Sequence, residues 1–183
     1  MGLQPDELRR KLNAEVRENI LRNNWFSHDA RWFLKVSQEL GFEAGNKLNQ
    51  ITLRSMAKTD MKRILQAVDC QTIESPDDVA TIFQIALELY FPRPMFEGEF
   101  KATDTDSTMV TVKRCHTLEE AKKAGVIGVY QCPCAIRFES WLAACRYGGV
   151  ANILRSMMRG DPLCEISLSS ISRLPDNWIP GEQ

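Results

Sequence analysis

The stretch MFEGEFKATDTDSTMVTVKRC, residues 95–115, decides the fold, because its hydrophobic period differs from that of the residues before it. Apolar or small residues occupy every second position from Phe96 to Ala102, and charged residues stand between them. This alternation predicts a strand with one buried face. TDTDS is typical of a turn, and residues 107–115 alternate again. We therefore expect an antiparallel hairpin.

The residues before the hairpin carry a helical period instead. Apolar residues recur every four positions from Leu8 to Ile20, which places them on one face of a helix. Caps, stops and prolines divide the rest of this region. The expected helices are residues 5–24, a second capped by Ser27 and stopped by Gly41, a third over 42–56, a shorter piece over 61–68, and one opened by the capping signal at 75–78 and ended by Pro92 and Pro94.

The residues after the hairpin mix both periods. Thr117 and Glu120 match a capping box for a short helix that Gly125 stops. A longer helix should begin within QCPC (131–134) and end at Gly148-Gly149. Residues 150–159 fit either a strand or a helix. Gly160-Asp161-Pro162 predicts a turn, and residues 163–169 alternate as a further strand.

Helices followed by strands with inserted helices predict an α+β fold. An N-terminal helical layer should pack on a mainly antiparallel sheet, with a pocket for a small molecule between them. We expect a single domain over residues 1–174, helical over 5–91 and built of the sheet and its helices over 95–170. Residues 175–183 should form a loosely held tail.

Composition excludes several classes of protein. The chain has 183 residues and a net charge of −1, which argues against the basic surface that nucleic acids require. No apolar run approaches the ~20 residues that span a bilayer, and the N-terminus lacks an apolar signal core. We expect a cytoplasmic protein without nucleic-acid or membrane partners, and its six cysteines should be reduced. A homodimer is compatible with this composition.

The cysteines before the helix at 134–148 are the clearest candidates for chemistry. A thiol at a helix N-terminus has a lowered pKa, so Cys132 or Cys134 fits a nucleophile, and Cys134 is nearer the helix start. Together with Cys115 and His116, these thiols offer four ligands of the kinds that zinc binds. Cys-x-Cys is not the usual zinc-knuckle spacing, so a structural pair and a redox pair are further interpretations.

Two other cysteines are expected in the core. Cys145 follows Cys134 by eleven residues, which corresponds to about 16 Å along a helix, so the two cannot bind one metal ion. Cys145 falls on an apolar helical face, and Cys164 alternates with inward apolar residues. Free cysteine is among the most buried residue types, so packing explains both positions.

A second candidate site lies in NNWFSHDARWF (23–33). His28 and Asp29 stand between Trp25 and Trp32, which favours an acid–base pair or a ligand-binding wall. The alternative is structural, with Asp29 supporting a helix N-terminus and His28 making a satisfied hydrogen bond. The chain lacks the glycine patterns of dinucleotide sites and the serine elbow of α/β-hydrolases.

Three resemblances follow from these motifs. The stretch NWFSHDARWFLKVSQELGFEAGNKLN (24–49), with VKRCHTLEEAKKAGV (112–126) and QCPC, resembles an uncharacterised family of small cytosolic proteins from anaerobic bacteria and archaea. An Arg-Cys pair, a second cysteine and GDPLCE (160–165) together look like aminothiazoline-carboxylate hydrolase, which opens a cyclic isothiourea. GDPLCE is also similar to the close of 4-vinyl-reductase-type ligand-binding domains, which are α+β.

These observations lead to two hypotheses. The first is a small-molecule-binding protein that acts as a cysteine-dependent hydrolase of a cyclic amidine or isothiourea, with Cys132 or Cys134 as nucleophile. His28 with Asp29, or His116, would be the acid–base group. The ligand-binding candidates are Trp25, Trp32, Arg114 and Arg137, and the two arginines would anchor a carboxylate. No cofactor is predicted in that case. The second is a non-enzymatic ligand, metal or redox sensor in which Cys115, Cys132 and Cys134 bind zinc or iron or respond to oxidation.

Overall fold

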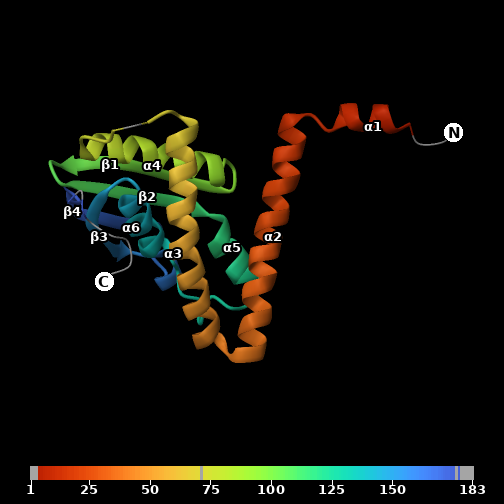
Figure 1. Cartoon of the computed structure of the whole chain (residues 1–183). Helices are drawn as coiled ribbons and strands as arrows, with labels where there is room; N and C mark the ends of the chain where they lie inside the picture. Colours follow the sequence, from red (N-terminus) through yellow and green to blue (C-terminus); the bar gives the residue numbers. More distant parts are fainter. Residues whose placement is uncertain (1–3, 71, 176, 178–183) are drawn as a thin grey trace. The chain divides into compact units, whose positions relative to one another are not determined.

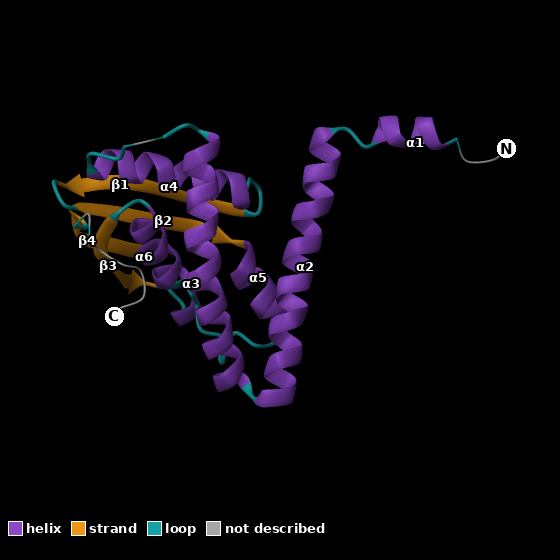
Figure 2. Ribbon diagram, in the orientation of Figure 1, coloured by secondary structure: helices purple, strands orange, loops and turns teal. Residues whose placement is uncertain are grey.

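The hairpin predicted over residues 95–115 is present as β1 (Phe96–Asp104) and β2 (Ser107–Cys115). It forms half of a four-stranded sheet in the order β1-β2-β4-β3, in which all neighbours are antiparallel (Figure 2). β3 (Tyr147–Arg155) and β4 (Cys164–Arg173) supply the other half. The predicted α+β class and antiparallel sheet are therefore confirmed.

The computed structural model of the chain describes residues 4–70, 72–175 and 177, and divides it into two units, residues 1–46 and 47–183. The first unit holds α1 (Pro5–Lys11), α2 (Ala14–Leu40) and the first turns of α3 (Phe42–Ala67). The second holds the rest of α3, α4 (Pro76–Tyr90), the sheet, α5 (His116–Lys123), α6 (Cys134–Ala144) and the short 3₁₀ helix η1 (Met157–Arg159) (Figure 1). The predicted tail over 175–183 lies almost entirely outside the described residues.

The core of the second unit lies between the sheet and the helices α3, α4 and α6. Phe83 of α4 is fully buried and makes edge-on contacts with Phe100 of β1 at 5.6 Å and with Trp141 of α6 at 5.2 Å between ring centroids. Edge-on aromatic pairs are favourable beyond their burial. This cluster joins α4 and α6 to the same face of the sheet.

Two helices are longer than the sequence predicted. α2 runs without a break through Ser27, which is therefore not a cap, and starts at Asn13, whose side chain accepts a hydrogen bond from the Val16 amide. α3 joins the two pieces expected over 42–56 and 61–68. Neither junction contains Gly or Pro, and serine inside a helix is tolerated.

Two helix ends also differ from the predictions. α5 starts at His116, so Thr117 lies inside its first turn and the predicted capping box with Glu120 does not form. α6 ends before Arg146, which adopts a positive φ of 67°. Gly149 belongs to β3, and a Cβ there would lie 2.9 Å from a methyl carbon of Leu142. The predicted capping box at Ser75 and Asp78 is confirmed.

Candidate functional site

The end of β2 carries Cys115, and a β-bulge decides which face of the sheet its side chain occupies. Between Val112 and Arg114 the pairing with β1 skips one residue, Lys113, which is the extra residue of the bulge. Strict alternation would place Cys115 and Val112 on opposite faces. The bulge returns Cys115 to the core face, where it pairs with the buried Phe96.

Cys164 starts β4 at the same end of the sheet. It pairs with Val112 of the antiparallel β2 and packs against the core, as the alternation predicted. Its sulfur accepts a hydrogen bond from the Met157 amide at 3.3 Å. Burial raises the pKa of Cys115 to about 11, and Cys132 and Cys164 add to this rise. Thiols from β2, β4 and the segment before α6 therefore lie within electrostatic reach of one another.

Cys132 and Cys134 have opposite protonation preferences. Cys134 is the first residue of α6, and its thiol donates a hydrogen bond to the Cys132 sulfur. That hydrogen bond is the largest contribution lowering the pKa of Cys132 to about 7. Burial opposes it, and the Cys134 backbone N–H and the Arg137 guanidinium lower the pKa further. The same hydrogen bond, with burial, raises the pKa of Cys134 well above its ordinary value. Of the two thiols, Cys132 therefore ionises more readily and Cys134 holds its proton more tightly.

Arg137 connects the thiols to a buried polar cluster. Its guanidinium carbon lies 5.2 Å from the ring centroid of Phe91 and 5.9 Å from that of Trp141, an arrangement typical of cation–π contacts. Burial raises the pKa of Asp60, and Arg137 acts in the opposite direction. Tyr90 donates a hydrogen bond to Asp60, and burial followed by the Asp60 charge raises the Tyr90 pKa to about 12.

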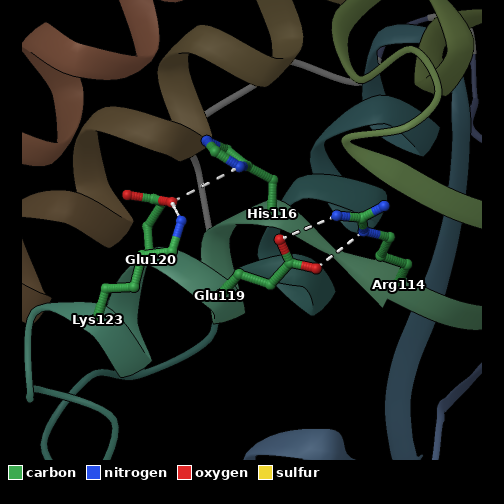
Figure 3. Close-up of polar contacts among 5 residues, drawn as sticks. All are labelled: Arg114, His116, Glu119, Glu120 and Lys123. Atoms are coloured by element: carbon green, nitrogen blue, oxygen red, sulfur yellow. Dashed lines mark hydrogen bonds and ion pairs between the residues drawn. The ribbon is translucent and has the colours of Figure 1, made fainter.

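The second predicted carboxylate anchor, Arg114, has a different environment (Figure 3). Its Nε and Nη2 atoms donate to the two carboxylate oxygens of Glu119 at 2.8 and 3.4 Å. Both side chains are well exposed. His116 Nδ1 lies 4.0 Å from Glu120 Oε1, which also pairs with Lys123 at 2.6 Å. The Arg114–Glu119 pair ties the end of β2 to α5 and engages the Arg114 guanidinium.

The aromatic candidates lie on α2 in the first unit. His28 and Asp29 are exposed and sit in the middle of the helix, not in its first turn. An open hollow of about 380 Å³ runs along this helix; the residues that line it are Asn24, Ser27, His28, Arg31, Trp32 and Lys35. Trp25 instead stacks on Phe26 at 4.8 Å. His28 and Trp32 thus share a surface, whereas the thiols belong to the second unit.

The thiols do not meet as a ligand set. Within residues 4–70, 72–175 and 177, no group of three or more His, Cys, Asp or Glu side chains is arranged to hold a metal ion. All six cysteines are free. The zinc or iron site over Cys115, His116, Cys132 and Cys134 stays a prediction.

Sequence analysis missed Asp60, Tyr90 and Trp141 as site residues. The signal for Asp60 was present, because it shares a helical stripe with the buried Ala57 and Ile64. An acidic residue on an apolar stripe requires a buried partner. Tyr90 falls on the apolar face of α4, and the sequence gives no sign that its hydroxyl meets Asp60.

Comparison with known proteins supports the fold. No family model matches the chain, and no curated protein matches its sequence. Among solved structures, a trafficking protein particle complex subunit 3 from Naegleria fowleri, covalently bound to palmitic acid, matches with a TM-score of 0.59. The sequence identity is 11%, and the match covers 88% of this chain and 99% of that chain. Within the described part of the chain, no helix is both long and apolar enough to cross a bilayer.

Proposed function

We propose that this protein binds a small molecule beside α6 and attacks it with the Cys132 thiolate. The observation that carries the proposal is the surroundings of the Cys132 sulfur. The thiol and the backbone N–H of Cys134 donate hydrogen bonds to this sulfur, and with the nearby Arg137 guanidinium they lower the Cys132 pKa to about 7. A thiolate that is abundant at neutral pH is the form of cysteine that reacts with electrophiles. Arg137 is the better of the two predicted carboxylate anchors, since Glu119 engages Arg114.

The proposed reaction is the hydrolysis of a cyclic amidine or isothiourea of the aminothiazoline-carboxylate type. The Cys132 thiolate donates an electron pair to the amidinium carbon, and the C=N electrons move to the nitrogen, giving a neutral adduct. One ring bond then breaks, and its leaving atom takes the proton of the Cys134 thiol. Water next adds to the carbon and displaces the Cys132 thiolate. Of the two protons released, one restores the Cys134 thiol, and the other, which the amidinium brought in, passes to solvent.

The acid–base role differs here from the one expected from the sequence. His28 with Asp29, or His116, is the pair that the sequence predicts. In this proposal Cys134 supplies the proton, because its thiol already donates a hydrogen bond to Cys132 and its pKa is raised. Microscopic reversibility then makes Cys134 the group that recovers a proton when water cleaves the adduct.

A second candidate is covalent capture without turnover, as in a ligand or redox sensor. The neighbour in fold holds palmitic acid covalently, which supports stable capture of an acyl or other electrophilic group by this fold. The sensor hypothesis uses Cys115, Cys132 and Cys134. Cys132 acts electrostatically on Cys115 and shares a hydrogen bond with Cys134, which fits this hypothesis. The proposal keeps the resemblance to an uncharacterised family of proteins from anaerobes and to 4-vinyl-reductase-type ligand-binding domains. It also keeps the homodimer as the proposed assembly.

The test is to incubate the full chain with 2-aminothiazoline-4-carboxylate. Product release and the mass of the intact protein are both followed. Turnover that Cys132→Ser abolishes, and that Cys134→Ser slows, supports the hydrolase. A stable adduct on Cys132 without product supports capture by a sensor. Equal turnover in the parent and in Cys132→Ser would overturn the nucleophile assignment.

A further inference from the structure

Among the residues that the structure describes, three buried polar atoms around Arg137 have no hydrogen-bond partner. They are Asp60 Oδ2, Arg137 Nη1 and Trp141 Nε1. Asp60 is 7% exposed and Trp141 is fully buried. The two residues come from different helices, α3 and α6, and Arg137 contacts the Trp141 ring and acts on Asp60 electrostatically. The three atoms therefore belong to one neighbourhood.

Such a group is costly for a purely structural cluster. A buried polar atom left without a partner destabilises the fold, and more so when it is charged. Buried polar groups in proteins are nearly always satisfied, so an exception calls for a functional explanation. The Tyr90 hydroxyl already donates a hydrogen bond to the Asp60 carboxylate. The atoms that remain have defined and different hydrogen-bonding roles.

The roles specify the chemistry of a partner. The Arg137 guanidinium and the Trp141 indole can only donate, and the guanidinium is always cationic. Asp60, when ionised, can only accept. A molecule that satisfies all three must carry an anionic acceptor at one end and a cationic or neutral N–H donor at the other.

We propose that Arg137, Trp141 and Asp60 bind a small zwitterion, whose carboxylate accepts hydrogen bonds from Arg137 and Trp141 and whose amidine donates to Asp60. The inference rests on the proposed function in one respect, because Arg137 also acts on Cys132. A ligand bound at Arg137 is adjacent to both the thiolate and Asp60. Asp60 and Trp141 are then specificity-determining residues, and a simple fatty acid, which lacks the N–H donor, is a poor ligand.

The test measures binding alone, by isothermal titration calorimetry of the full chain carrying Cys132→Ser. Three probes separate the two ends of the ligand: 2-aminothiazoline-4-carboxylate, 2-aminothiazoline and thiazoline-4-carboxylate. The bifunctional probe should bind about tenfold or more tightly than either fragment, since hydrogen bonds to charged groups are worth about 1.5–3 kcal/mol. Asp60→Asn should remove that advantage and leave the affinity for thiazoline-4-carboxylate unchanged.

Trp141→Phe provides a second variant in case Asp60→Asn does not fold. It keeps an aromatic ring and removes the N–H donor, so it should weaken both carboxylate probes and spare 2-aminothiazoline. Equal affinities for all three probes in the Cys132→Ser chain, or variants that bind as their parent does, would show a structural cluster and overturn the inference.

The proposed function and the zwitterion site can be refuted independently of each other. Selective binding of the bifunctional probe, with no adduct or turnover in the chain that retains Cys132, would confirm the zwitterion site and refute the nucleophile. Adduct formation without preference for the bifunctional probe would support the nucleophile and refute the zwitterion site.

Discussion

Replacing Cys134 with alanine should raise the pKa of Cys132. The Cys134 hydrogen bond is the largest contribution that lowers this pKa from 9.0 to about 7. A hydrogen bond to an ionised group is worth about 1.5–3 kcal/mol, and one pKa unit corresponds to about 1.36 kcal/mol. Its loss should therefore raise the pKa by about one to two units. Cys134→Ser keeps an O–H donor and is the matched control.

The assay is the rate of Cys132 alkylation by iodoacetamide between about pH 5 and pH 10, followed by peptide mass spectrometry. The midpoint of the rate profile reports the thiolate pKa. It should lie near 7 in the parent and in Cys134→Ser, and distinctly higher in Cys134→Ala. Cys145, which is buried and whose pKa is raised to about 12, is an internal control that should stay unmodified. A parent midpoint near 9, or equal shifts in the two variants, would refute the reasoning.

Four further predictions concern stability and are measured by chemical denaturation. Phe83→Ala empties the centre of the aromatic core and should lower the free energy of unfolding by about 3–5 kcal/mol; a loss below 1 kcal/mol would contradict the core assignment. Ser75→Ala removes the N-cap of α4 and should cost about 1 kcal/mol. Hydrogen bonds from Glu74 and Ser75 lower the pKa of Asp78. The stability that the Asp78 carboxylate contributes should therefore be present above pH 3.8 and disappear as the pH falls through the lower pKa of the folded state. Asp78→Asn would show no such pH dependence. Gly45→Ala should destabilise the α2–α3 turn, because its Cβ would overlap the Ser37 hydroxyl, whereas the exposed Gly128→Ala has open space and is the control.

The elements with a strong local signal were predicted correctly. Alternation in residues 95–102 and 107–115 specified β1 and β2, and the capping box at Ser75 specified the start of α4. Boundaries that rested on an ambiguous local signal were wrong. Ser27 can cap a helix or lie within one, and in the structure it lies within α2.

The candidate site divides in the same way. The sequence identified Cys132, Cys134 and Arg137 as candidates for chemistry, because thiols before a helix and a nearby cation can be recognised from the sequence. It favoured Cys134 on the helix dipole alone. The structure favours Cys132, since the thiol and the backbone N–H of Cys134, the first residue of α6, both donate hydrogen bonds to the Cys132 sulfur.

The sequence by itself determined the order of helices and strands, the α+β class and the residue types available for catalysis, because these depend on periodicity and local backbone preference. Tertiary structure alone decided which thiol is ionised, that a bulge at Lys113 turns Cys115 toward the core, and that Asp60 meets Arg137. These outcomes depend on contacts between residues far apart in the chain, where burial and the arrangement of a few charges set the energies. No local pattern encodes them.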